Sequence, residues 1–323
     1  MAGDALQIRL GNGIELSGPM EVRLDPRRLE AGAVNCISHA HSDHLPRSFE
    51  DCRALASNIT LRCASERVRR KIEGRECDSI KMLNSGHIPG STMFLVEGER
   101  KVLYTGDMCT RDRYGSEGAK PVKTDVLVIE STYGSPHYVF PPTEEMGDIM
   151  HDWIGDSLKH GYSVALYAYP LGKSQTLIRM LEEFEPYLQG TVLDMTKMVE
   201  DGGESGYRYR EYAKDEGKEP CVVICPTGSR GGIASHGRGK FRTAAVSGWA
   251  LDRSYRYAMG TDEAFAISDH ADFEELIQFT KACSPSMVFV QHGFDEVLAR
   301  EIKKRLGIDA QPMKRNQRSL AEF

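Results

Sequence analysis

Six short apolar segments of this chain each lead into a histidine or an acidic residue. The segments and the polar residues that follow them are 33–37 with His39, 79–83 with His87, 101–105 with Asp107, 125–129 with Glu130, 264–267 with Asp269 and His270, and 287–290 with His292. In a layered α/β protein, polar groups at the carboxyl ends of strands converge on a common crevice. The pattern therefore predicts an α/β fold in which these side chains lie together.

The segment 39–44 is the densest in potential metal ligands. Its sequence, His-Ala-His-Ser-Asp-His, supplies His39, His41, Asp43 and His44 directly after an apolar run. Neutral imidazole nitrogens and carboxylate oxygens are ligands that suit Zn²⁺ or Mn²⁺. We therefore expect this loop to bind metal, and its donors are numerous enough to serve two adjacent ions.

The charge of the chain argues against a protein that coats nucleic acid through bulk electrostatics. The formal net charge is −6 at pH 7, so an anionic substrate would have to be held locally. The segment 228–242 is rich in glycine and basic residues and contains no acid. We predict that this segment grips the substrate, with Arg230, His236, Arg238 and Lys240 as contacting side chains.

Composition and cysteine spacing indicate where the protein works. The chain has 323 residues, of which 40% are hydrophobic, and can bury a large core. No apolar stretch approaches the ~20 residues of a membrane span, and the amino terminus has no signal-peptide pattern. The eight cysteines include no Cys-x-x-Cys pair, which favours reduced thiols. We expect a soluble cytoplasmic protein without a membrane partner.

The triplet Gly172-Lys173-Ser174 matches the end of a nucleotide-binding P-loop. The first glycine of that motif would stand at position 167, which is Tyr167, so the phosphate-binding turn is incomplete. We interpret the triplet instead as the start of a helix that follows a strand over 163–169. Free backbone donors at a helix amino terminus can hold a phosphate, so Lys173 and Ser174 are predicted to contact the substrate.

Further motifs make the pattern more specific. They are Glu-Ser-Thr-Tyr-Gly at 130–134, Pro-Leu-Gly-Lys-Ser-Gln at 170–175, Ser-Gly-Trp at 247–249 and Ser-Asp-His-Ala-Asp-Phe at 268–273. Together with the 39–44 loop, they resemble the metallo-β-lactamase superfamily, and specifically its nucleic-acid-processing β-CASP branch. The loop alone is typical of the whole superfamily, whereas the later motifs are typical of this branch. The resemblance covers essentially the whole chain.

The resemblance implies an αββα sandwich with an inserted α/β cap. The sandwich would comprise residues 1–134 and 263–323, and the cap would comprise residues 135–262. It also implies two divalent metal ions, held by His39, His41 and His87 at the first site, by Asp43, His44 and His292 at the second, and by Asp107 between them. Diiron relatives have glutamate where this chain has His41, so zinc is the expected metal and manganese is the alternative.

The resemblance further implies phosphodiester hydrolysis, with Asp43, Glu130 and His270 as catalytic residues. The metals would provide hydroxide, and His270, paired with Glu130, would protonate the leaving oxygen, because a neighbouring carboxylate favours the imidazolium form. Asp269 and Asp272 are the rival carboxylates for this pairing. We expect Asp272 to cap a helix over 273–281 instead.

The later motifs are more similar to small exonucleases associated with DNA-repair helicases and ligases than to messenger-RNA cleavage factors. We therefore expect an exonuclease that acts on single-stranded DNA in repair, with a repair helicase as a partner. An RNA-processing exo- or endoribonuclease is the alternative within the same branch. Two other classes stay open: a thioesterase-like hydrolase of small molecules and an inactive scaffold subunit.

Overall fold

The computed structural model describes residues 6–212, 219–229 and 240–314. The chain divides into two compact units, which are described separately. Unit 1 contains Met1–Arg111, Glu117–Val139 and His270–Phe323, and unit 2 contains Asp112–Ser116 and Phe140–Asp269. No helix among the described residues has the length and apolar character needed to span a membrane.

Unit 1 contains two larger sheets. The four-stranded sheet has the order β1 (Gln7–Gly11), β2 (Gly13–Ser17), β3 (Val22–Leu24), β5 (Val34–Cys36). The six-stranded sheet has the order β20 (Asp309–Pro312), β19 (Met287–Gln291), β12 (Val126–Glu130), β11 (Val102–Tyr104), β10 (Thr92–Val96), β9 (Ile80–Asn84). Two-residue strands form two small additional pairs: β4 (Arg28–Leu29) with β6 (Ser48–Phe49), and β7 (Arg53–Ala54) with β8 (Glu73–Gly74).

The four central strands of the six-stranded sheet, β19, β12, β11 and β10, are buried on both faces. Along β12, Val126 and Val128 join a core cluster that includes residues of the four-stranded sheet, so the two sheets pack against each other. Leu127 and Ile129 point the other way and pack with α7 (Phe273–Cys283) and α8 (Asp295–Leu306). A strand that is buried on both faces needs a continuous apolar sequence, which explains why β12 is Val-Leu-Val-Ile before its terminal glutamate.

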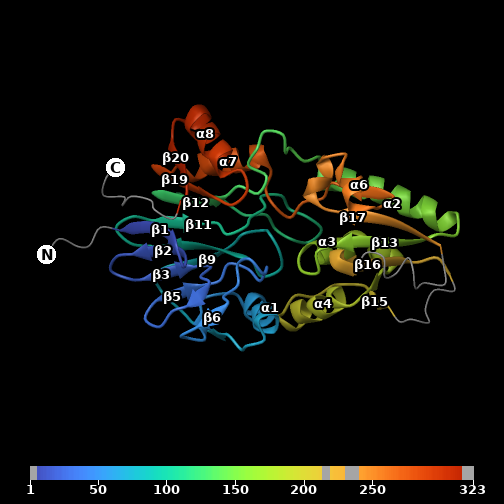
Figure 1. Cartoon of the computed structure of the whole chain (residues 1–323), viewed down its shortest axis with the longest axis horizontal. Helices are drawn as coiled ribbons and strands as arrows, with labels where there is room; N and C mark the ends of the chain where they lie inside the picture. The colour runs from blue at the N-terminus through green and yellow to red at the C-terminus, as the bar shows by residue number, and fades with distance from the viewer. Residues whose placement is uncertain (1–5, 213–218, 230–239, 315–323) are drawn as a thin grey trace. The chain divides into compact units, whose positions relative to one another are not determined.

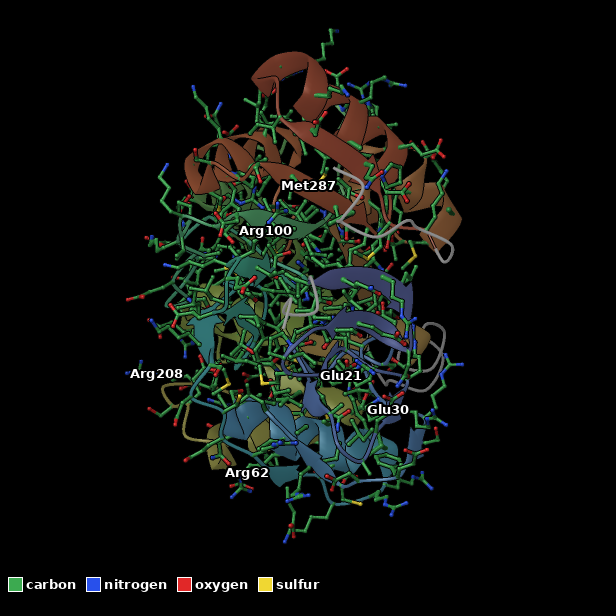
Figure 2. The ribbon with its side chains drawn as sticks, turned by 90° about the vertical axis from the view of Figure 1, so that its left-hand side faces the viewer. Glu21, Glu30, Arg62, Arg100, Arg208 and Met287 are labelled. Carbon is green, nitrogen blue, oxygen red and sulfur yellow. The ribbon has the colours of Figure 1, made fainter. Side chains whose placement is uncertain are left out.

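The helices of unit 1 lie at different places around these sheets. In Figure 1, α7 and α8 lie beside β19 and β20, whereas α1 (Asn58–Val68) lies near β5 and β6. Figure 2 shows the same separation, with Met287 at the start of β19 close to the carboxyl-terminal helices and Arg62 of α1 at the other end of the unit. Arg69 ends α1 by taking a left-handed φ of 53°.

Unit 2 is built on a six-stranded sheet whose described pairings are all parallel. Its order is β15 (Arg210–Glu211), β14 (Tyr187–Leu188), β16 (Val222–Pro226), β13 (Ser163–Ala168), β17 (Phe241–Val246), β18 (Glu263–Phe265). The helices of its described residues are α2 (Thr143–Lys159), α3 (Lys173–Met180), α4 (Thr191–Asp201) and α6 (Tyr255–Met259), with short helices η1 (Glu182–Phe184), η2 (Thr227–Ser229) and η3 (Gly248–Leu251). The core of the unit joins β13 with residues of α2, α3 and α4.

The last strand of unit 2 differs from the sequence-based expectation. The segment 264–267 was expected to belong with the sandwich, beginning at residue 263. In the structure, β18 pairs in parallel with β17, and Phe265 and Ile267 are buried in the core of unit 2. The chain therefore returns to unit 1 between Asp269 and His270.

Candidate metal centre

The loop 39–44 is held in place by Asp25, which follows β3. The carboxylate of Asp25 accepts hydrogen bonds from the backbone N–H and the hydroxyl of Ser38, each at 2.6 Å. It also lies 2.6 Å from His44 Nδ1 and accepts a hydrogen bond from the hydroxyl of Tyr104 at 2.7 Å. Asp25 therefore fixes both the entrance of the loop at Ser38 and its last histidine.

Sequence reasoning missed Asp25. Its sequence context, Val22-Arg23-Leu24-Asp25-Pro26, lacks a continuous apolar run, and Asp-Pro is typical of a turn. The left-handed φ of 47° at Asp25 agrees with such a turn. Because the carboxylate accepts the Nδ1 proton of His44, Nε2 of the same ring is left for a metal ion, which is how buried carboxylates orient histidine ligands. The sequence does contain one signal for this role: a short strand is followed by an acidic residue and, further along the chain, by the histidine-rich loop.

One group of donor atoms is compact. His39, His41, His87 and Asp107 each offer an atom within 4.8 Å of the others. Asp107 Oδ2 lies 3.4 Å from His39 Nε2 and 3.7 Å from His87 Nε2, and His87 Nε2 lies 3.2 Å from His41 Nδ1. Ligand atoms around a tetrahedral zinc ion, each ~2.0–2.1 Å from it, are ~3.4 Å apart. The group therefore has the dimensions of a metal site.

The second oxygen of Asp107 faces another histidine. Asp107 Oδ1 lies 3.5 Å from His44 Nε2, and Asp43 Oδ2 lies 3.9 Å from the same nitrogen. The rings of His44 and His292 are stacked, with their centroids 5.2 Å apart. Among the described residues, however, His44 forms a compact ligand group only with Asp25 and His39, and no such group includes Asp43 or His292. The structure thus brings Asp43 and His292 beside His44, but less tightly than the residues around His39.

Two buried ring nitrogens in this cluster have no hydrogen-bond partner among the described residues, His39 Nε2 and His44 Nε2. Both imidazoles are almost completely buried. A buried polar atom without a partner is costly, and nearly all such atoms in folded proteins are satisfied. A divalent metal ion bound at each nitrogen would satisfy it, so the residues present fit metal ions.

Protonation in the cluster follows from burial and from the neighbouring charges. Burial lowers the pKa of His39 and lowers that of His87 well below its usual value, which favours the neutral ring that binds metal. For Asp107, burial alone would raise the pKa, but His44 and His39 outweigh it and hold the pKa well below its usual value. For His44, burial opposes the charged form, but Asp107 and Asp25 raise its pKa to about 10. A metal ion at His44 would therefore displace a proton.

Glu130 and His270 form a pair next to this cluster. Nδ1 of His270 lies 3.0 Å from both carboxylate oxygens of Glu130, which is fully buried at the end of β12. Because an ionised carboxylate only accepts, we assign the ring proton to Nδ1. The rings of His270 and His87 are 4.4 Å apart between centroids. Asp107, Glu130 and His270 also offer donor atoms within 4.8 Å of one another.

The two rival carboxylates have other partners. Asp272 caps α7: its Oδ1 accepts from the backbone N–H of Glu275 at 2.9 Å, and the Glu275 side chain accepts from the N–H of Asp272. This capping box confirms the helix-cap prediction. Asp269, in unit 2, lies 2.7 Å from Nη1 of Arg113 and 2.9 Å from Nζ of Lys173.

The structure describes some, but not all, of the residues that were predicted to contact the substrate. Lys173 is buried against Asp269, and the hydroxyl of Ser174 donates to the carbonyl of Tyr169 at 2.7 Å. At the start of α3, the side chain of Gln175 already accepts the N–H of Gly172. Lys240 is exposed, with Nζ 5.9 Å from the centroid of the Tyr162 ring. Arg230, His236 and Arg238 lie outside the described residues.

Comparisons with known proteins find relatives, among them one that is named as a DNA enzyme and one that is named as an RNA enzyme. No family model matches the chain. A protein of Opitutus terrae named "Probable DNA ligase" is 33% identical over 288 residues, which are 85% of this chain and 28% of that protein. "Probable RNase MJ4" of Methanocaldococcus jannaschii is 24% identical over 272 residues, which are 68% of this chain and 63% of that protein. The chain therefore spans less than a third of the first relative and just under two thirds of the second.

A solved structure supports the fold. A protein of unknown function from Enterococcus faecalis superimposes with a TM-score of 0.67, covering 99% of this chain and 100% of that chain, at 12% sequence identity. At this identity the likeness concerns the fold alone.

Proposed function

Because this chain belongs to the β-CASP branch of the metallo-β-lactamase superfamily, we propose that it is a metal-dependent nuclease that hydrolyses phosphodiester bonds in single-stranded nucleic acid. The observation that carries the proposal is the position of the Glu130–His270 pair. The pair lies against the histidine cluster, through the contact of the His270 and His87 rings. A metal site and a proton-transferring histidine are the two parts that phosphodiester hydrolysis needs.

The proposal includes the arrangement of the domains. We assign the two packed sheets of unit 1, with α7 and α8 on the outer face of one of them, to an αββα sandwich. We assign the parallel α/β unit that contains Phe140–Asp269 to an inserted cap. The boundaries expected from sequence, after residues 134 and 262, would then lie a few residues later.

We propose the metal ligands that the resemblance implies. His39, His41 and His87 would hold one ion, Asp43, His44 and His292 would hold the other, and Asp107 would join them. This is supported by Asp107, whose two oxygens face different histidines. Zinc fits the mixed nitrogen and oxygen donors, and manganese is the alternative. When bound, such ions supply an activated water and polarise the phosphoryl oxygen.

The chain's own residues would then complete the reaction. Glu130 accepts the Nδ1 proton of His270 and so sets the orientation of the ring. Nε2 on the opposite side of the ring would deliver a proton to the leaving ribose or deoxyribose oxygen. An alkoxide is a poor leaving group, so this proton transfer is worth ~10²–10⁴ in rate. Asp25 would keep His44 in the orientation that the metal site requires.

This pair also argues against the two proposals from other classes. A thioesterase releases a thiolate, which leaves readily without a proton, and so gains little from Glu130 and His270. An inactive scaffold subunit has no need to keep buried metal donors, whereas His39 and His44 keep ring nitrogens that lack a partner among the described residues. Both observations favour a nuclease.

We propose single-stranded DNA as the substrate, attacked from an end. The proposal is supported by the motifs typical of small repair-associated exonucleases and by the ligase-named relative, which aligns with 85% of this chain. A DNA-repair helicase would then be a natural partner. RNA is the second candidate, because another relative is named an RNase.

The test uses end-labelled DNA and RNA single strands of identical sequence. The metal-free protein is incubated with each strand and with Zn²⁺, with Mn²⁺, or with either ion plus excess chelator. We expect a ladder from one end of the DNA that depends on metal and is abolished by chelator. A ladder on RNA alone would replace the DNA proposal with the RNA one, and intact strands under every metal condition would refute the nuclease proposal.

A further inference from the structure

The peptide bond that joins His270 to Ala271 is anchored to one segment, Met108–Arg111. The N–H of Ala271 donates to the carbonyl of Met108 at 2.6 Å. Nη2 of Arg111 donates to the carbonyl of His270 at 2.8 Å. The N–H of Met108 in turn donates to Glu130 Oε1 at 2.7 Å, and Glu130 bonds to the His270 ring. Ring, carboxylate and backbone therefore form one closed set of hydrogen bonds.

Arg111 connects this set to the first turn of α7. Its Nη1 lies 2.5 Å from Glu275 Oε2, and the hydroxyl of Thr110 donates to Glu275 Oε1 at 2.7 Å. Glu275 is also the residue that completes the capping box with Asp272. One guanidinium thus bridges the His270 carbonyl and the fixed end of a helix. Its side chain is 19% exposed, so solvent screens these contacts only in part.

The chemistry of arginine suits this role. A guanidinium presents several donors in a rigid plane and can hold two acceptors in a fixed relation, which the single flexible ammonium of lysine cannot do. Hydrogen bonds from a charged donor are also stronger than those between neutral groups. The carbonyl of His270 lies on the peptide that sets the direction of its side chain, so a shift there moves the ring.

We propose that Arg111 is a positioning residue for His270. It holds the peptide after the His270 side chain so that the ring stays bonded to Glu130 with Nε2 at the reacting oxygen. The inference rests on the proposed function in one respect, because it takes His270 as the proton donor. A misplacement of ~1 Å at a reacting group can cost ~10²-fold in rate.

The substitution Arg111→Met keeps length and apolar bulk but removes the donors. Arg305→Met is the matched control: Arg305 Nη1 lies 2.7 Å from Glu274, the neighbour of Glu275 on α7. Circular dichroism and thermal unfolding establish that both variants fold. On an oligonucleotide, we expect Arg111→Met to lower kcat by ~10- to 100-fold with KM nearly unchanged, and Arg305→Met to have little effect.

A second substrate separates positioning from general damage. The p-nitrophenyl ester of thymidine 5′-monophosphate releases nitrophenolate, which leaves without a proton. We expect Arg111→Met to lose at most a few-fold on this ester, as His270→Ala should. On the oligonucleotide, the double variant should be no slower than His270→Ala alone, since residues that act as a unit are non-additive. Equal losses on both substrates, additive losses, or no loss would overturn the proposal.

A readout that is independent of activity covers the case in which the wild type cleaves neither substrate. That result would refute the nuclease proposal, and NMR would still test the geometry. In protein labelled with ¹⁵N-histidine, the Nδ1 proton of His270 that is bonded to Glu130 should give a protected signal. We expect this signal to weaken or vanish in Arg111→Met and to persist in Arg305→Met. A signal that is unchanged in Arg111→Met would show that the arginine does not position the ring.

Discussion

Buried polar atoms differ in their partners between the histidine cluster of unit 1 and the group formed by Asp269, Arg113 and Lys173 in unit 2. Around Asp107, His39 and His44 each keep a buried ring nitrogen that has no hydrogen-bond partner among the described residues. Around Asp269, by contrast, the chain itself supplies two cations, Arg113 and Lys173, to one buried carboxylate. Buried ring nitrogens without a hydrogen-bond partner indicate a place for a metal ion. A carboxylate that is already paired with two cations of the chain indicates a structural role instead.

The largest expected effect comes from the residue that joins the two halves of the histidine cluster. Asp107→Ala should abolish tight metal binding and lower nuclease activity by more than ~10³-fold, because bound metal contributes several kcal/mol to stabilising the transition state. Metal content is measured by elemental analysis after dialysis, with the exposed Asp78→Ala as the control. Full metal content in Asp107→Ala would contradict the proposal that Asp107 is a metal ligand.

The next effect separates metal binding from proton transfer. His270→Ala should lower turnover on oligonucleotides by ~10²–10⁴-fold, the range for losing a general acid, while metal content stays unchanged. The exposed His160, at the end of α2, provides the control substitution His160→Ala. Loss of metal in His270→Ala would assign His270 to the metal site instead.

A smaller effect is expected at the carboxylate that orients His44. Asp25→Asn keeps the shape of the side chain but removes its charge, and we expect metal affinity to fall ~10- to 100-fold, as for other carboxylates behind histidine ligands. Titration with a competing chelator measures this change. If affinity were unaltered, Asp25 would serve only the folding of the loop through Ser38 and Tyr104.

The smallest effect is expected at Lys173 and tests whether this residue of unit 2 has a structural role. Lys173→Met leaves Asp269 paired with Arg113, so we expect a loss of ~1–3 kcal/mol in the free energy of unfolding, measured with urea, from one charge-assisted contact. Nuclease KM should then hardly change. A raised KM with unaltered stability would instead support the sequence-based prediction that Lys173 contacts the substrate.

Local sequence patterns predicted the elements of the site well. The mixed α/β character and the strands before Asp107, Glu130 and His292 follow from short apolar runs that end in a polar residue, and β11, β12 and β19 occur there. The cap at Asp272 also followed from local chemistry, because a short acid before a helix satisfies its free donors. Such features depend on neighbours in the sequence and are therefore visible in it.

Features that depend on distant partners could not be predicted in this way. Asp25 acts through His44 and Tyr104, which are far away in sequence, while its own neighbours indicate only a turn. The strand β18 has an apolar sequence that fits either unit, and only its pairing with β17 assigns it to unit 2. Lys173 follows a phosphate-binding pattern, yet its partner Asp269 lies almost a hundred residues later.

Three neighbouring parallel strands, β11, β12 and β19, lead to Asp107, Glu130 and His292. Adjacent strands stand ~4.8 Å apart, a spacing fixed by main-chain hydrogen bonds. The separation of Glu130, which bonds to the proposed proton donor His270, from the proposed metal ligands Asp107 and His292 is thus set by the backbone ladder. Sequence drift in the surrounding loops should leave that separation intact, whereas a one-residue slip of β12 would turn Glu130 to the opposite face of the sheet.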